Sequence, residues 1–121
     1  MYKSKIVTIG ELVPEFKAEN LLVLFGKDAP PELADISIIH EPSNLEQNVF
    51  ETNKTLQIDN TDYKILKVGD EANPNFNDLG HVSIYFSDNS DTEILPGAIL
   101  VSPATYPEFD VNGEIKVFWF N

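Results

Sequence analysis

The chain has 121 residues, a length typical of one domain, and 42% of them are hydrophobic, which is enough for a core without disulfides or a metal. Its formal net charge of −12 excludes most nucleic-acid binders and repels an anionic membrane surface, while it attracts basic partners. We therefore expect a single domain over residues 1–121 that is cytoplasmic, because cysteine is absent and no apolar run is long enough for a signal peptide or a membrane span.

Short strand-like segments separated by turn residues dominate the N-terminal third of the chain. Residues 2–9 are rich in β-branched side chains, and residues 21–25 are wholly apolar, which is typical of a strand buried on both faces. Residues 36–40 alternate in polarity and end at His40. We expect three strands here.

The C-terminal half contains further segments of this kind: residues 55–58, 63–68, 81–86, 99–101 and 115–120. The first two flank the turn Asp-Asn-Thr-Asp and predict a hairpin, and the last follows Asn112-Gly113, a strong hairpin signal.

Helical signals are weak. Residues 30–35 can form one turn with a proline at its first position, and residues 73–80 can form another that ends at Gly80. Neither is long enough to cover a sheet. The sequence therefore predicts an all-β fold, an antiparallel barrel or barrel-like sandwich of about seven or eight short strands.

Acidic residues in the loop of residues 87–93 do not match a calcium-binding loop, because the spacing differs and no glycine supplies the sharp turn. A zinc site would need three or four converging ligands, and the two histidines have no local spacing that supports one. We expect no metal and no cofactor.

His40 and His81 are the only side chains whose ordinary pKa lies near neutral pH. His40 stands at the end of its expected strand, where an imidazole can expose one nitrogen while a hydrogen bond holds the other. His81 lies on the polar face of residues 81–86. Each histidine can equally be a structural residue that satisfies a strand end or the surface.

Three stretches in residues 20–101 resemble the glucitol/sorbitol-specific enzyme IIA of the sugar phosphotransferase system. They are "LLVLFGKDAPPELADISIIH", "YKILKVGDEANPNFNDLGHVSIYF" and "ILPGAILV". The resemblance implies a β-barrel that accepts a phosphoryl group on a histidine from the phosphocarrier protein HPr. It also implies transfer to the IIB part of a IIB/IIC transporter, with His40 as the phosphorylated residue and His81 in a supporting role.

The chain has no arginine to stabilise a phosphate. Backbone N–H groups, His81, Ser43 or Lys27 are the candidates for that task. Glu41 beside His40 would repel a phosphoryl group, so we expect it to point away or to orient the ring.

Two other functions remain open: a non-catalytic β-barrel binding module, and a regulatory relative that docks partners without transferring a phosphoryl group. A shallow exposed depression that holds both histidines would favour the carrier. Burial of either histidine in an apolar core would favour a structural role.

Overall fold

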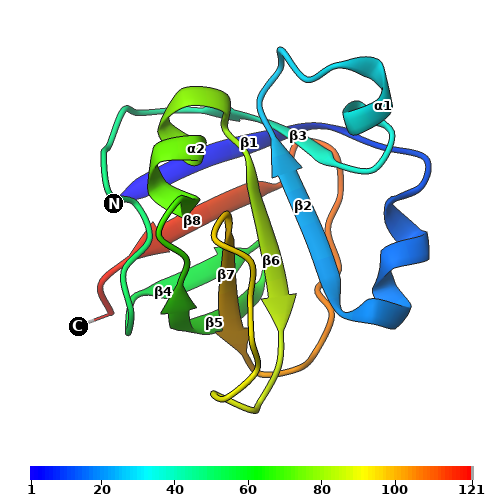
Figure 1. Cartoon of the computed structure of the whole chain (residues 1–121). Helices are drawn as coiled ribbons and strands as arrows, with labels where there is room; N and C mark the ends of the chain where they lie inside the picture. The colour runs from blue at the N-terminus through cyan, green and yellow to red at the C-terminus, as the bar shows by residue number, and fades with distance from the viewer. Residues whose placement is uncertain (121) are drawn as a thin grey trace.

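The computed structural model describes residues 1–120 and contains a closed barrel of eight strands in the order β1-β3-β2-β6-β7-β5-β4-β8 (Figure 1). The strands are β1 (Tyr2–Ile9), β2 (Leu21–Phe25), β3 (Ile38–Pro42), β4 (Thr55–Ile58), β5 (Thr61–Val68), β6 (Val82–Phe86), β7 (Ala98–Ser102) and β8 (Glu114–Phe118). The barrel and the number of strands confirm the prediction.

The prediction of an all-antiparallel barrel needs correction, because the sheet is mixed. β2 pairs with β3 in parallel, and β6 pairs with β7 in parallel, whereas the other neighbours are antiparallel. Parallel neighbours cannot be joined by a tight hairpin. Residues 26–37 and residues 87–97 provide the two longer connections.

Short helices occupy the connections. The helices α1 (Pro31–Ala34) and α2 (Ala72–Leu79) lie where the sequence predicts them, and α2 ends at Gly80 with a left-handed φ of 68°. The 3-10 helix η1 (Val13–Glu19), which we did not predict, connects β1 to β2. Only Val13 of η1 is buried, so its sequence carries little helical pattern.

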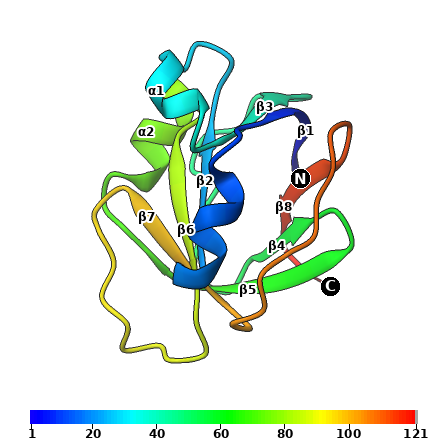
Figure 2. The same ribbon diagram turned by 90° about the vertical axis from the view of Figure 1, so that its right-hand side faces the viewer.

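The inward side chains of the strands fill the barrel, and several large ones have no exposed surface: Ile6, Leu24, Leu56, Ile65, Ile84 and Ile99. The views in Figures 1 and 2 place α1 and α2 at the same end of the barrel. Phe76 of α2 packs its ring edge-on against Tyr2 and Phe50, so α2 closes this end with an aromatic side chain.

Two details differ from the expected strands. β3 runs to Pro42, so His40 lies within the strand rather than at its end. The chain turns at Asn112, whose φ is 72°, and β8 then begins at Glu114, but no strand precedes that turn. β8 pairs instead with β1 and β4, which closes the barrel.

Candidate functional site

A cavity of about 520 Å³ opens at the barrel end beside the C-terminal end of α2. Its walls come from segments that are far apart in the sequence: β1, the end of β2 with residues 26–28, β3 with residues 44–47, and residues 76–80. The closure of the barrel brings these segments together (Figure 1).

His40 lies in the wall of this cavity and is 1% exposed. Its Nε2 is 2.8 Å from the carbonyl oxygen of Gly80, and its Nδ1 is 3.1 Å from Oγ of Ser4. Because a carbonyl oxygen only accepts, Nε2 carries the proton and donates to Gly80. The lone pair is therefore on Nδ1, and the Ser4 hydroxyl donates to it.

The surroundings of His40 favour its neutral form. The ring of Phe76 stacks on the imidazole with centroids 5.3 Å apart and an interplanar angle of 13°. Burial lowers the pKa of His40 below its usual 6.5, and the hydrogen bond to Gly80 opposes part of that shift. At neutral pH the ring is therefore an uncharged imidazole with one lone pair, which is the state that a nucleophile requires.

We expected His40 to stand at a strand end with one ring nitrogen exposed, and the structure shows that this prediction is wrong. β3 continues past His40, and Phe76 and Ser4 cover the ring on the inside of the barrel. A backbone carbonyl, rather than the carboxylate of Glu41, orients the imidazole. Glu41 is exposed and lies on the rim of the cavity.

Two hydroxyl groups of β1 approach the site from inside the barrel. Tyr2, Ser4 and Ile6 alternate along the strand and all point inward. Ser4 has no exposed surface, and Tyr2, which is 3% exposed, lines the cavity. The polar Ser4 on this otherwise apolar stripe was a signal that the sequence contained and that we did not use.

The rim of the cavity is acidic. It carries four carboxylates, those of Asp28, Glu41, Glu46 and Asp78, and one ammonium group, that of Lys27. This charge repels a free anion and attracts a cationic surface.

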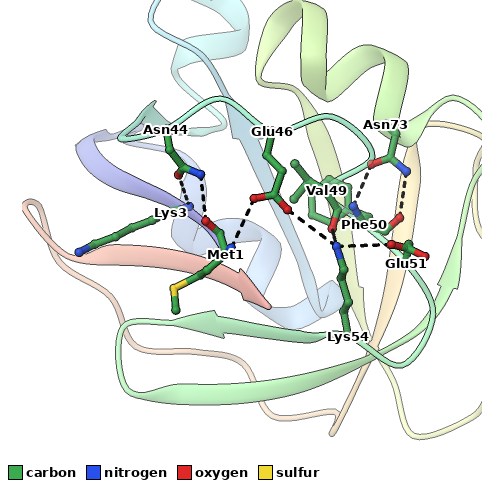
Figure 3. A network of polar contacts seen from close by, with 9 residues as sticks. All are labelled: Met1, Lys3, Asn44, Glu46, Val49, Phe50, Glu51, Lys54 and Asn73. Carbon is green, nitrogen blue, oxygen red and sulfur yellow. Dashed lines mark hydrogen bonds and ion pairs between the residues drawn. The ribbon is translucent and has the colours of Figure 1, made fainter. Parts of the chain in front are cut away.

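The segment between β3 and β4 forms one wall, and side-chain amides hold it at two points (Figure 3). The Asn44 amide accepts from the backbone N–H of Lys3 and donates to the carbonyl oxygen of Met1, both at 2.9 Å. The Asn73 amide of α2 accepts from the N–H of Phe50 and donates to its carbonyl oxygen, also at 2.9 Å. The wall is therefore fastened to β1 and to α2.

A buried lysine adds a third point of attachment (Figure 3). The Nζ of Lys54 donates to the carbonyl oxygen of Val49 at 3.1 Å and lies 3.5 Å from Glu51 and 4.0 Å from Glu46. Lys54 is 5% exposed, whereas Leu45, on the same wall, is 96% exposed. The segment, attached at these three points, thus presents the apolar side chain of Leu45 to the solvent.

His81 is half-buried and does not line the cavity. Its Nδ1 lies 3.2 Å from the carbonyl oxygen of Leu24, to which it donates, and its ring packs on Phe25 with centroids 4.7 Å apart. Gly80 directly precedes His81, and the carbonyl oxygen of Gly80 accepts the hydrogen bond from His40. The structure therefore connects the two histidines through the Gly80–His81 peptide rather than through their rings.

Of the other predicted phosphate-stabilising groups, Lys27 lines the cavity and Ser43 does not. Within residues 1–120 no three histidine or acidic side chains are grouped so that they could hold a metal ion. No helix in that part of the chain has the length and apolar character needed to cross a membrane.

Comparisons with known proteins identify the family and agree with the fold. The family "PTS system glucitol/sorbitol-specific IIA component" matches residues 1–116. The glucitol/sorbitol-specific EIIA components of Shigella flexneri and Escherichia coli are each 26% identical to the chain over 102 residues, which cover 84% of this chain and 81% of theirs.

A crystal structure of a PTS system IIA component from Enterococcus faecalis superimposes with a TM-score of 0.86. It is 24% identical and covers 96% of this chain and 98% of its own, so it supports the barrel fold. The match over residues 1–116 decides the family: the chain belongs to the glucitol/sorbitol-specific IIA components of the sugar phosphotransferase system.

Proposed function

We propose that the chain is the enzyme IIA phosphocarrier of a glucitol/sorbitol phosphotransferase system and that His40 carries the phosphoryl group. The donor is phosphorylated HPr, and the acceptor is the IIB component of the IIB/IIC transporter. The observation that carries the proposal is the neutral imidazole of His40, held by the Gly80 carbonyl in the wall of the cavity.

The transfer exchanges one N–P bond for another. The lone pair of the His40 imidazole attacks phosphorus while the N–P bond of the donor histidine breaks, and the donor ring takes back its electron pair. His40 then carries the phosphoryl group on one nitrogen and a proton on the other. When Nδ1 is the attacking atom, the proton stays on Nε2, and the Gly80 carbonyl stabilises the positive charge that this proton places on the ring.

Either nitrogen can attack once it has left its present partner. Attack by Nδ1 requires that the Ser4 hydroxyl turn away and that the phosphoryl group reach this buried side of the ring, where Ser4 has no exposed surface. Attack by Nε2 requires that the ring leave the Gly80 carbonyl and that its proton move to Nδ1, where Ser4 Oγ can accept a hydrogen bond. The two routes give different isomers of phosphohistidine.

Docking of a basic protein fits the surface around the cavity. The acidic rim attracts a positive patch, and once docked that patch neutralises the carboxylates that would repel the phosphoryl group. The exposed apolar side chains of Leu45 and Leu79 stand on the same rim. Because His40 is 1% exposed, we expect the partner to widen the entrance as it docks.

His81 fits a positioning role. Its hydrogen bond to Leu24 and its contact with Phe25 hold the turn that contains Gly80. The N–H of Gly26 donates to the carbonyl oxygen of Leu79 at 2.9 Å and fixes the same turn to the end of β2. His81 thus places the carbonyl that orients the His40 ring.

One observation favours a second function, that of a non-catalytic binding or regulatory module. His40 is almost fully buried and both its ring nitrogens have partners, as a structural histidine would. The cavity, the neutral ring and the family to which the chain belongs favour the phosphocarrier.

Phosphorylation from phosphoenolpyruvate with purified enzyme I and HPr separates the two functions. The wild-type chain should acquire an acid-labile, base-stable phosphoryl group, and His40→Gln should not. A melting curve must show that His40→Gln is folded, because the substitution removes two buried hydrogen bonds. Equal labelling of the two proteins would exclude His40 from the reaction, and an unlabelled wild type would favour the non-catalytic module.

A further inference from the structure

One buried polar atom near His40 has no partner. The hydroxyl oxygen of Tyr2 is inaccessible to water and makes no hydrogen bond within residues 1–120. Buried hydroxyl groups are nearly always paired, because an unpaired one has lost its bonds to water without replacement. An unpaired hydroxyl on a residue that lines the same cavity as His40 therefore requires an explanation.

The position of Tyr2 relates it directly to the site. Its ring packs edge-on against Phe76 with centroids 5.3 Å apart, and Phe76 stacks on His40 at the same centroid distance. Tyr2 is two residues from Ser4 on the inward face of β1, and Ser4 contacts Nδ1 of His40. Tyr2 and His40 both line the cavity.

The Tyr2 hydroxyl is a donor at neutral pH. Burial raises the pKa of Tyr2 to about 12, and the Ser4 side chain, which lies close to the hydroxyl without the geometry of a full hydrogen bond, opposes part of that rise. The proton therefore stays on the oxygen and can be donated to an acceptor once the site opens far enough to expose the hydroxyl. Such a donor is scarce at this site, because the chain contains no arginine and the rim holds one lysine.

We propose that the Tyr2 hydroxyl is held unpaired in the resting protein so that it can donate a hydrogen bond to a phosphoryl oxygen on His40. This inference rests on the proposed phosphocarrier function and adds the group that receives the phosphate. A bond that is absent in the resting state and forms only as the phosphoryl group arrives favours the transfer rather than the docking of the donor.

The test is the variant Tyr2→Phe, which keeps the ring and removes only the hydroxyl. Its melting temperature should equal or exceed that of the wild type, because the substitution removes an unpaired buried polar atom. Its rate of phosphorylation by phosphorylated HPr should fall about tenfold or more, with the KM for the donor unchanged.

The chain offers two matched controls. The Ser37 hydroxyl is also buried and unpaired but lies outside the cavity, so Ser37→Ala should leave both stability and transfer near the wild-type values. The Tyr63 hydroxyl donates to the carbonyl oxygen of Thr105 at 2.6 Å, so Tyr63→Phe should lower the melting temperature without slowing transfer.

Transfer at the wild-type rate in Tyr2→Phe would overturn this inference and leave the phosphocarrier function standing. A slower transfer that accompanies a lower melting temperature would also overturn it, because it would show a structural role. If the wild type itself receives no phosphoryl group on His40, the proposed function fails and this inference fails with it.

Discussion

Replacing Gly80 with alanine should disturb both the fold and His40. Gly80 has a φ of +68°, which an L-residue adopts at a cost of about 1–2 kcal/mol. A Cβ at this position would lie 2.9 Å from the backbone nitrogen of Gly26 and 3.3 Å from Nε2 of His40. Neither the backbone of Gly26, which directly follows β2, nor the stacked imidazole can move away easily, so the crowding adds about 1–3 kcal/mol.

We therefore expect Gly80→Ala to lower the free energy of unfolding by about 2–5 kcal/mol, which corresponds to a fall in melting temperature of about 8–20 °C. Urea denaturation and a thermal melt measure these changes. The matched control is Gly97→Ala, whose Cβ would meet only the side-chain amide of Asn75, at 3.3 Å. That variant should unfold within about 1 kcal/mol of the wild type.

The two variants together test the geometry around His40. Where Gly80→Ala remains folded, its phosphorylation should be slower than that of Gly97→Ala, because the Cβ displaces the imidazole from the Gly80 carbonyl. A loss of stability below about 1 kcal/mol in Gly80→Ala would refute the reasoning, because it would mean that neither the left-handed backbone nor the close packing constrains this turn.

Three further predictions concern pH, salt and His81. Because folding lowers the pKa of His40, the unfolded chain binds the proton first as the pH falls. The free energy of unfolding, measured by denaturation, should therefore decrease as the pH falls through about 6.5 and lower. His40→Gln should make this pH dependence weaker. The association rate with HPr should fall as salt rises, because the acidic rim is screened; a flat response in stopped flow would show that docking is mainly apolar. His81→Gln should cost about 1 kcal/mol, because it loses the bond to Leu24 and the contact with Phe25, and it should slow transfer in both directions; normal transfer would make His81 purely structural.

Much of the fold could be predicted because each strand carries its own signal. The β-branched run at Tyr2–Ile9 and the apolar run at Leu21–Phe25 both became strands with the predicted bounds. Gly80 closed α2 as its position after a helical segment indicated. The parallel pairing of β2 with β3 could not be predicted, because strand direction depends on where the connection places the next strand, and no local pattern encodes that.

The site could be predicted only in part. The resemblance of the "IIH" segment to the enzyme IIA family singled out His40. The alternation of polar and apolar residues predicted an exposed strand end for it, whereas α2 and β1 cover the side chain in the structure. The closed barrel brings the Phe76 ring onto the imidazole and the Tyr2 ring onto Phe76, and no local sequence pattern indicates either contact. The hydrogen bond between His40 and the Gly80 carbonyl could not be predicted from a local sequence pattern, because the two residues are 40 positions apart along the chain.

The central claim is that His40 carries the phosphoryl group, and the most direct measurement is NMR of the phosphorylated, ¹⁵N-labelled protein. Coupling between phosphorus and an imidazole nitrogen identifies both the residue and the nitrogen. We predict one phosphoryl group per chain, on a ring nitrogen of His40, with the His81 ring unmodified. A phosphoryl group on His81 or on any other side chain would contradict the claim.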